Sequence, residues 1–267
     1  MAAALLILLL AMTLALAACH HDSSPLGQTL GEKLGPGEVA WKAPDPLTIS
    51  SEANSQAILR GQEIFTHTTT AASQYAGNQM TCANCHLKNG MQAWSAPLVG
   101  VTHRYPSFSK RAGRSIDLPT RIQECMVRSE NGKPLPPDGD EMKGLVAYMT
   151  WLSKAAPSGH LHGTGLIEVK APAKIDTADG ANVYATICAN CHGPDGAGRP
   201  PAYPPLWGAN SFNSGAGMAQ PEKMARFVLK NMPFDQPGTL TVQQAFDVAA
   251  FVDSHPRPAM NPAYQQY

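Results

Sequence analysis

The sequence has no surplus of charge of either sign. Its 267 residues include 20 Lys and Arg against 20 Asp and Glu. A protein that binds nucleic acid or an acidic membrane surface usually carries a basic surplus, because it must neutralise phosphates. The balance gives no reason to expect either partner, and we predict that the protein binds no nucleic acid.

Long apolar runs are also scarce. One extended run, residues 4–18, is followed at once by polar sequence. It is shorter than the ~20 residues that span a bilayer, and it is typical of a signal peptide. We therefore expect residues 1–18 to be removed and the mature chain to lie in the periplasm.

The end of this run contains a candidate site for attachment of the mature chain to the membrane. Leu16-Ala17-Ala18-Cys19 resembles a bacterial lipobox, in which the cysteine becomes the lipid-bearing first residue. The alternative is cleavage after the small-residue pattern Ala15-Leu16-Ala17, which would release a soluble protein. We favour a lipid anchor at Cys19, since the sequence offers this cysteine no other role.

Cysteine is sparse but patterned. Of six cysteines, four lie in two Cys-x-x-Cys-His motifs, at residues 82–86 and 188–192. In such a motif two thiols form thioethers to one haem and the histidine ligates its iron. A single Cys-x-x-Cys also suits a redox disulfide or half a zinc site, but two copies, each followed by His, favour haem. We predict two covalently attached haems c, with these attachment residues and iron ligands: Cys82, Cys85, His86, Cys188, Cys191 and His192.

The two halves of the chain form a degenerate repeat around these motifs. Apolar residues at helical spacing predict a helix before each motif, 55–65 and 177–187, and a closing amphipathic helix, 141–152 and 242–252. An N-terminal helix that crosses an aromatic-bearing C-terminal helix over a haem is the arrangement of small cytochrome c domains. The predicted fold is therefore all-α, with two such domains and one haem in each.

Composition places the domain borders. Stretches rich in Pro, Gly, Ser or Ala that lack periodicity predict little fixed structure. We also expect a loop over residues 66–77 of the first domain. The predicted segments are a signal peptide (1–18), a flexible tether (19–50), the first domain (51–154), a Pro/Gly/Ala-rich linker (155–173) and the second domain (174–267).

The second domain offers a methionine as the other axial ligand of its iron. Met232 lies in Lys230-Asn231-Met232-Pro233, ahead of the last helix, where small cytochromes place such a ligand. Met218 and Met224 are the alternatives. A His/Met haem has a raised reduction potential, which suits the exit of electrons.

The first domain offers Cys125 and Met126 in the corresponding region. Asp117 is a candidate cap for a helix that starts at Leu118-Pro119 and ends before Asn131-Gly132. Residues four, seven and eight positions apart share one helical face. That face carries Arg121, Cys125, Arg128 and Ser129.

The surroundings of Cys125 are basic. Between His103 and Lys133 there are seven Lys and Arg against three acidic residues. Guanidiniums shift a thiol toward thiolate, and their forked donors suit a small oxyanion. The alternative is a solvated basic face beside a buried cysteine.

At these residues the chain resembles the thiosulfate dehydrogenase family of dihaem cytochromes c. The resemblance covers roughly residues 50–256, and its motifs are specific in combination. It rests on Cys82–His86, Tyr105-Pro106, Arg121–Lys133, Cys188–His192, Pro204–Gly208 and Asn231–Pro233.

The resemblance implies an activity and a site. The activity is oxidative coupling of two thiosulfates to tetrathionate, reversible in some members, with two electrons passing to an acceptor such as a soluble periplasmic cytochrome. The implied site has Cys125 as the distal thiolate ligand of the first haem, with Arg111, Arg121 and Ser129 around the substrate. Some relatives have a lysine directly before the axial methionine that exchanges with it, whereas this chain has Asn231 there.

Two other functions compete with this one. A dihaem electron carrier without a substrate would have methionine at both irons and no need for the arginines near Cys125. A thiol-ligated subunit of a sulfur-oxidising multienzyme complex would need a carrier-protein partner. The two intact haem motifs in one chain favour the free enzyme.

Overall fold

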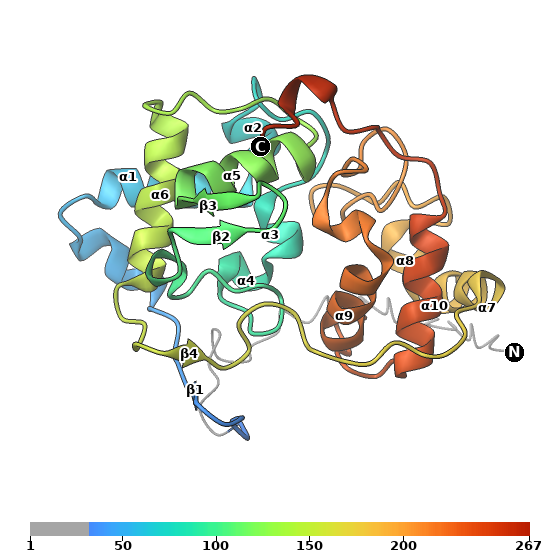
Figure 1. Ribbon diagram of the computed structural model, residues 1–267. Coiled ribbons are helices and arrows are strands. Elements are labelled where there is room, and N and C mark those ends of the chain that lie inside the picture. Colours follow the sequence, from blue (N-terminus) through green and yellow to red (C-terminus); the bar gives the residue numbers. More distant parts are fainter. Residues whose placement is uncertain (1–31) are drawn as a thin grey trace, which may run out of the picture.

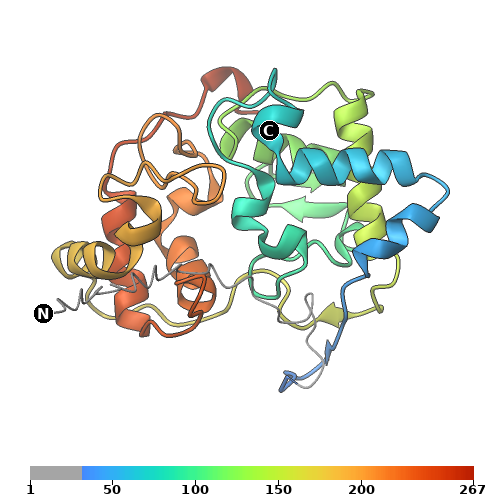
Figure 2. The same ribbon diagram turned by 180° about the vertical axis from the view of Figure 1, so that it is seen from behind.

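The computed structural model describes residues 32–267, and it consists of two helical domains that lie side by side (Figure 1). The predicted signal peptide and Cys19 lie outside the described residues. In residues 32–267 no helix combines the length and the apolar character needed to cross a membrane. The view from behind shows the same two bodies, with Tyr267 brought back to the first domain (Figure 2).

The first domain is built on two crossing helices, α1 (Ser55–Thr66) and α6 (Asp140–Ser153). They cross so closely that a Cβ on Gly61 would overlap the carbonyl oxygen of Gly144. Tyr148 is fully buried at this crossing and stacks at 5.8 Å on Trp151. The remaining elements are η1 (Pro46–Ser51), α2 (Thr68–Ala71), α3 (Cys82–Cys85), α4 (Leu87–Gly90), η2 (Val101–His103), the antiparallel pair β2 (Ser107–Ser109) and β3 (Arg114–Ile116), and α5 (Leu118–Arg128).

The second domain repeats this plan. Helix α7 (Thr177–Val183) crosses α10 (Val242–Asp253), where a Cβ on Gly180 would overlap the carbonyl oxygen of Asp247. Its core contains Tyr184, Trp207 and Phe246, among other residues. The remaining elements are η3 (Tyr184–Cys188), α8 (Ala189–His192), η4 (Gly217–Ala219), α9 (Pro221–Asn231) and η5 (Pro262–Tyr264).

The structure confirms most of the predicted helices. The helices expected at 55–65, 141–152 and 242–252 are present within one or two residues. The helix expected at 177–187 changes to a π-helical turn from Tyr184, which leads into the haem motif. The loop expected over 66–77 contains the end of α1 (Thr66) and all of α2, so that prediction is wrong for five of its residues.

The expectation of a flexible tether is wrong for residues 32–50. Strand β1 (Glu38–Val39) pairs in parallel with β4 (His160–Leu161) of the predicted linker. Trp41 is 2% exposed, and its Nε1 donates to the carbonyl oxygen of His162 at 2.6 Å. A buried tryptophan gives this Pro- and Gly-rich stretch the apolar anchor that fixed structure requires.

The first part of the predicted linker is also packed. The backbone N–H groups of Trp94 and Ala96 donate to the carbonyl oxygens of Gly163 and Gly165, both at 2.8 Å. Residues 160–165 therefore lie along the first domain. The chain then runs below both domains to α7 in the view of Figure 1.

The interface between the domains includes residues beside the first haem motif and residues at the end of α5. Met80 is 3% exposed and belongs to the core of the second domain. Asn213 Nδ2 donates to the carbonyl oxygen of Val127 at 2.8 Å and to Asn131 Oδ1 at 3.0 Å. These contacts join the two domains through polar groups with defined partners.

Candidate active site

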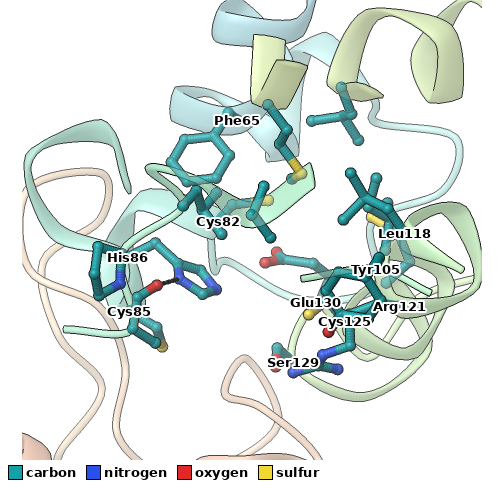
Figure 3. A pocket seen from close by; sticks show the side chains of 18 of the residues that line it. Phe65, Cys82, Cys85, His86, Tyr105, Leu118, Arg121, Cys125, Ser129 and Glu130 are labelled. Atoms are coloured by element: carbon teal, nitrogen blue, oxygen red, sulfur yellow. Dashed lines mark hydrogen bonds between the residues drawn. The ribbon is translucent and has the colours of Figure 1, made fainter. Parts of the chain in front are cut away.

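A cavity of about 250 Å³ lies inside the first domain, beside the first Cys-x-x-Cys-His motif. One wall carries Cys82, Cys85 and His86, and the opposite wall is α5 with Cys125 (Figure 3). The apolar lining includes Phe65, Leu98, Ile122, Leu145 and Met149. The two sulfur-bearing walls that the sequence predicted are thus brought together.

Both motif histidines are oriented for iron ligation. His86 Nδ1 lies 2.7 Å from the carbonyl oxygen of Ala96, and His192 Nδ1 lies 2.9 Å from that of Pro204. A carbonyl only accepts, so each Nδ1 carries the proton and each Nε2 keeps a free lone pair. Burial lowers the pKa of His86 to about 4, so its imidazole is neutral, as a ligand must be.

The residues present fit a covalently attached haem c. None of the four motif cysteines is paired in a disulfide, so all four sulfurs are available for thioether bonds. The apolar cavity suits a porphyrin, and its opposite walls supply an imidazole and a thiol at the two faces. Cys191 and His192 both lie on α8, whereas Cys85 ends α3 and His86 follows it as the C-cap.

Helix α5 presents Cys125 as its capping signals predict. Asp117 Oδ1 accepts from the backbone N–H of Thr120 at 2.8 Å, and Pro119 occupies the first turn. Arg121 and Ser129 line the same cavity, so three of the four residues predicted on one face are brought together. The charge of Cys125, ahead of the other causes, raises the pKa of Arg121.

Arg128, which the sequence analysis placed on the same helical face as Cys125, does not line this cavity. It is 8% exposed, and its Nε and Nη2 donate to the carbonyl oxygen of Tyr267 at 3.1 and 2.6 Å. Its Nη1 donates to the carbonyl oxygen of Gly215 at 3.3 Å. The side chain therefore crosses to the second domain instead of turning toward Cys125.

Arg111, which the sequence analysis placed around the substrate, lies outside the cavity lining, with Nη1 4.0 Å from Glu124 Oε2. Two other charged residues near Cys125, Glu130 and Lys223, were not predicted as site residues. Glu130 lines the cavity at 1% exposure, and burial, followed by the charge of Cys125, raises its pKa to about 8. Lys223 of α9 lies in the field of this cluster: burial first, and then the charges of Arg111 and Arg121, lower its pKa. The only signal in the sequence was that acids interrupt a basic stretch.

The three candidate methionine ligands of the second domain differ in their surroundings. Met232 follows the last residue of α9 and is half-buried, and its N–H donates to the carbonyl oxygen of Val228 at 2.9 Å. Met224 is 5% exposed in the domain core and Met218 packs against that core. Met232 thus stays the predicted ligand, at a helix end that leaves its side chain free of the core.

Comparison with known proteins identifies both domains. Residues 60–157 match the model of the SoxA/TsdA cytochrome c domain, and residues 176–252 match that of cytochrome c oxidase, cbb3-type, subunit III. A thiosulfate dehydrogenase of Stutzerimonas stutzeri is 40% identical over 95% of this chain and 86% of the relative. The chain belongs to the thiosulfate dehydrogenase family.

Two further thiosulfate dehydrogenases support this family assignment. The protein from Allochromatium vinosum is 37% identical over 89% of this chain and 94% of its own length. The structure of thiosulfate dehydrogenase TsdBA from Marichromatium purpuratum in its as-isolated form superposes with a TM-score of 0.79 at 33% identity. That match covers 83% of this chain, which spans half the length of TsdBA.

The family assignment establishes the class of protein. The chain is an oxidoreductase built of two cytochrome c domains, which carry covalently bound haem c. The sequence prediction of an all-α fold with two such domains is confirmed at this level.

Proposed function

We propose that the protein couples two thiosulfates to tetrathionate, 2 S₂O₃²⁻ → S₄O₆²⁻ + 2 e⁻. One S–S bond forms between the outer sulfurs, and two electrons leave through the two domains to an external acceptor such as a soluble cytochrome. The relatives named thiosulfate dehydrogenase support this proposal. The observation that carries it is a half-buried Cys125 beside Arg121 in the cavity wall opposite His86.

The cationic groups near Cys125 offset the electrostatic repulsion that opposes this reaction. Two dianions repel each other, and fixed guanidiniums offset that repulsion at the point of coupling. Arg121 presents forked donors that match a sulfonate group, and the Ser129 hydroxyl lines the same cavity. Arg121 lies on α5 with Cys125 and Ser129 is the C-cap of that helix, so binding and sulfur chemistry occur on one rigid element.

Cys125 is the proposed nucleophile. Its thiolate and one thiosulfate give Cys125–S–S–SO₃⁻ with release of two electrons. The outer sulfur of a second thiosulfate then attacks the sulfane sulfur of this adduct, which yields tetrathionate and returns the thiolate. Charge and sulfur balance in both steps, and no proton is consumed.

Haem c, when bound, supplies one-electron transfer to this reaction. His86 and Cys125 are the residues that would hold the iron in the first domain, and His192 and Met232 in the second. Thiolate ligation lowers a haem potential and methionine ligation raises it. Electrons therefore run from the substrate domain toward the second domain.

Replacing Cys125 tests the proposal. Cys125→Gly should keep two haems per chain by mass spectrometry and leave the spectrum of the second domain unchanged. It should abolish tetrathionate formation from thiosulfate with ferricyanide as acceptor. A fully haem-loaded variant that turns over at the wild-type rate would overturn the proposal, and a wild-type protein without turnover would favour an electron carrier.

We further propose that the protein is exported and anchored through Cys19, because c-type attachment motifs follow a signal-peptide pattern in this chain. Cys19→Ser should move the protein from the membrane fraction to the soluble periplasm. A wild-type protein that is already soluble and free of lipid contradicts the anchor.

A further inference from the structure

Glu124, the residue before Cys125, is a buried carboxylate on the helix that carries the proposed chemistry. It is 3% exposed. Its Oε2 lies 3.0 Å from Arg121 Nη1 and 4.0 Å from Arg111 Nη1. Its Oε1 is buried and has no hydrogen-bond partner among residues 32–267. A carboxylate removed from water in this way is costly unless cations compensate it.

The two arginines reach this carboxylate from different elements. Arg121 lies one turn before Glu124 on α5, whereas Arg111 lies in the turn between β2 and β3. Like charges would drive the two guanidiniums apart if nothing lay between them. A single carboxylate oxygen between them holds them together and joins the β2–β3 hairpin to α5.

The same contact leaves most of the Arg121 donors available. A guanidinium has five N–H donors in a fixed plane. Within the described part of the chain, Glu124 is the one hydrogen-bond partner of the Arg121 guanidinium. Arg121 also lines the cavity beside Cys125 and Tyr105 (Figure 3). Fixing one nitrogen on Glu124 therefore sets the plane in which the other donors face an incoming anion.

We propose that Glu124 is a positioning residue of the anion site: with Arg111 on the other side of its carboxylate, it fixes the Arg121 guanidinium so that Arg121 receives a sulfonate group beside Cys125. This inference rests on the proposed function, since it assumes that the anion is thiosulfate. Glu124 touches no substrate and acts through Arg121.

Glu124→Gln separates positioning from simple charge, because it keeps the shape and removes the negative charge. Loss of positioning should raise the thiosulfate KM and the inhibition constant of sulfate, an unreactive tetrahedral dianion, about fivefold or more. If Glu124 were only a counter-charge, the variant would bind sulfate more tightly. Glu124→Asp keeps the charge but retracts the carboxylate by one methylene, and positioning predicts that it too weakens sulfate binding.

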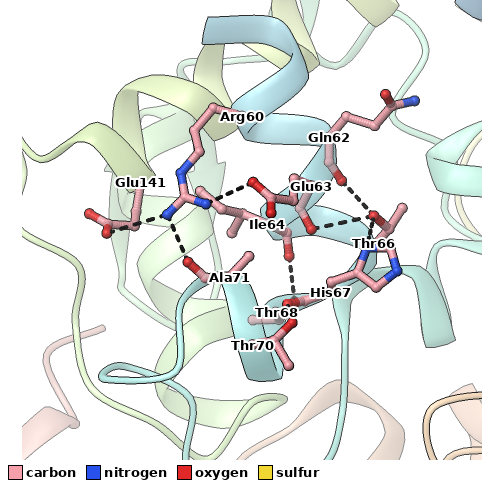
Figure 4. Close-up of polar contacts among 10 residues, drawn as sticks. All are labelled: Arg60, Gln62, Glu63, Ile64, Thr66, His67, Thr68, Thr70, Ala71 and Glu141. Atoms are coloured by element: carbon pink, nitrogen blue, oxygen red, sulfur yellow. Dashed lines mark hydrogen bonds and ion pairs between the residues drawn. The ribbon is translucent and has the colours of Figure 1, made fainter. Parts of the chain in front are cut away.

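The Arg60–Glu63 pair supplies the matched control (Figure 4). It has the same spacing of three residues on a helix of the same domain, with an N–O distance of 2.9 Å. Neither residue lines the cavity. Glu63→Gln should leave the sulfate inhibition constant and the thiosulfate KM unchanged at constant ionic strength.

Arg121→Ala, measured in parallel, distinguishes the two proposals. If Arg121→Ala weakens sulfate and thiosulfate binding but Glu124→Gln and Glu124→Asp do not, the role of Glu124 is overturned and the proposed function stands. If none of the three variants changes either constant, the anion site itself is wrong. A lower sulfate constant in Glu124→Gln also overturns the positioning role.

Discussion

Arg121 and Arg128 show how a single helical face serves two purposes. Seven residues are almost two turns, so the two side chains leave α5 in nearly the same direction, about 10 Å apart along its axis. The first lies beside the cavity, and the second is bonded to Gly215 and Tyr267 of the second domain. Arg121 and Arg128 therefore share a helical face but have different roles, because their surroundings differ at the two ends of α5.

Arg128→Ala should therefore act on stability and not on substrate binding. It removes three hydrogen bonds to the backbone oxygens of Gly215 and Tyr267, both of which are half-buried. We expect a loss of about 1–3 kcal/mol in the free energy of unfolding, by the usual cost of such groups. Denaturant unfolding and steady-state kinetics check this. A raised thiosulfate KM with unchanged stability would return Arg128 to the substrate site.

The sequence predicted the residues of the cavity walls because their signals are local. Cys82, Cys85 and His86 follow a fixed spacing, and Asp117 caps α5 within three residues. The orientation of the Arg128 side chain depends on the backbone oxygen of Tyr267, which is 139 residues away in the sequence. No spacing or periodicity encodes such a contact, because backbone acceptors are present at every residue.

At the scale of elements, the β1–β4 pair fastens the segment before the first domain to the segment after it. His162 is buried between two carboxylates, with Nδ1 2.5 Å from Glu38 Oε2 and Nε2 3.2 Å from Glu32 Oε2. The edge of the Trp94 ring packs against it at 5.1 Å. The hydrogen bonds to both acids outweigh the effect of burial and raise the pKa of His162 above its ordinary 6.5, and that of Glu38 falls below its ordinary 4.5.

These pKa shifts predict the pH range in which the β1–β4 pair is most stable. The His162 contribution is full below pH 6.5 and is lost as pH rises through its raised pKa. The Glu38 contribution is full above pH 4.5 and is lost as pH falls through its lowered pKa. Hydrogen exchange of residues 38–41, corrected for intrinsic rates, should show greatest protection between these values. Protection that grows steadily with pH would contradict this, and His162→Gln should remove the decline on the alkaline side.

The end of α9 is a second element with a defined role. Asn231 is 3% exposed, and its Nδ2 donates to the carbonyl oxygens of Phe227 at 2.9 Å and Trp94 at 3.0 Å. It fixes the helix end against the first domain, directly before Met232. The sequence located the candidate ligand, but it gave no hint that the neighbouring amide reaches across the interface.

Met232→Gly should remove the weak thioether-to-iron absorption near the red end of the visible spectrum. The potential of that haem should fall, because a thioether ligand raises it. Electron exit should slow more than substrate binding changes, as measured by stopped-flow reduction and by KM. An unchanged spectrum would transfer the ligand role to Met218 or Met224.

At the scale of the whole molecule, polar contacts join the two domains. Asn78 Nδ2 donates to the carbonyl oxygens of Ser129 and Ser211 at 2.8 and 3.1 Å, and Asn213 bonds to Val127 and Asn131. The repeat in the sequence predicted two domains, but polar residues scattered over loops gave no sign of how they meet. The fixed structure around β1 and β4 was missed for a similar reason, since Trp41 donates a hydrogen bond to a residue 121 positions away.

Asn213→Ala should loosen the domain interface. It removes two hydrogen bonds to the end of α5 and the acceptor for the N–H of Gly215. We expect a loss of about 1–3 kcal/mol and a separation of the two domains into distinct calorimetric transitions. Asn54→Ala is the control, since the Asn54 side chain makes no capping hydrogen bond at the start of α1. A single unshifted transition in Asn213→Ala would show that other contacts hold the domains together.

The burial of Met80 in the core of the second domain bears on the order of biogenesis. Met80 lies two residues before Cys82, and Cys85 is half-buried against the same core. Any machinery that joins a porphyrin vinyl group to Cys85 needs access to this thiol. Docking of the second domain therefore belongs after covalent attachment at the first motif.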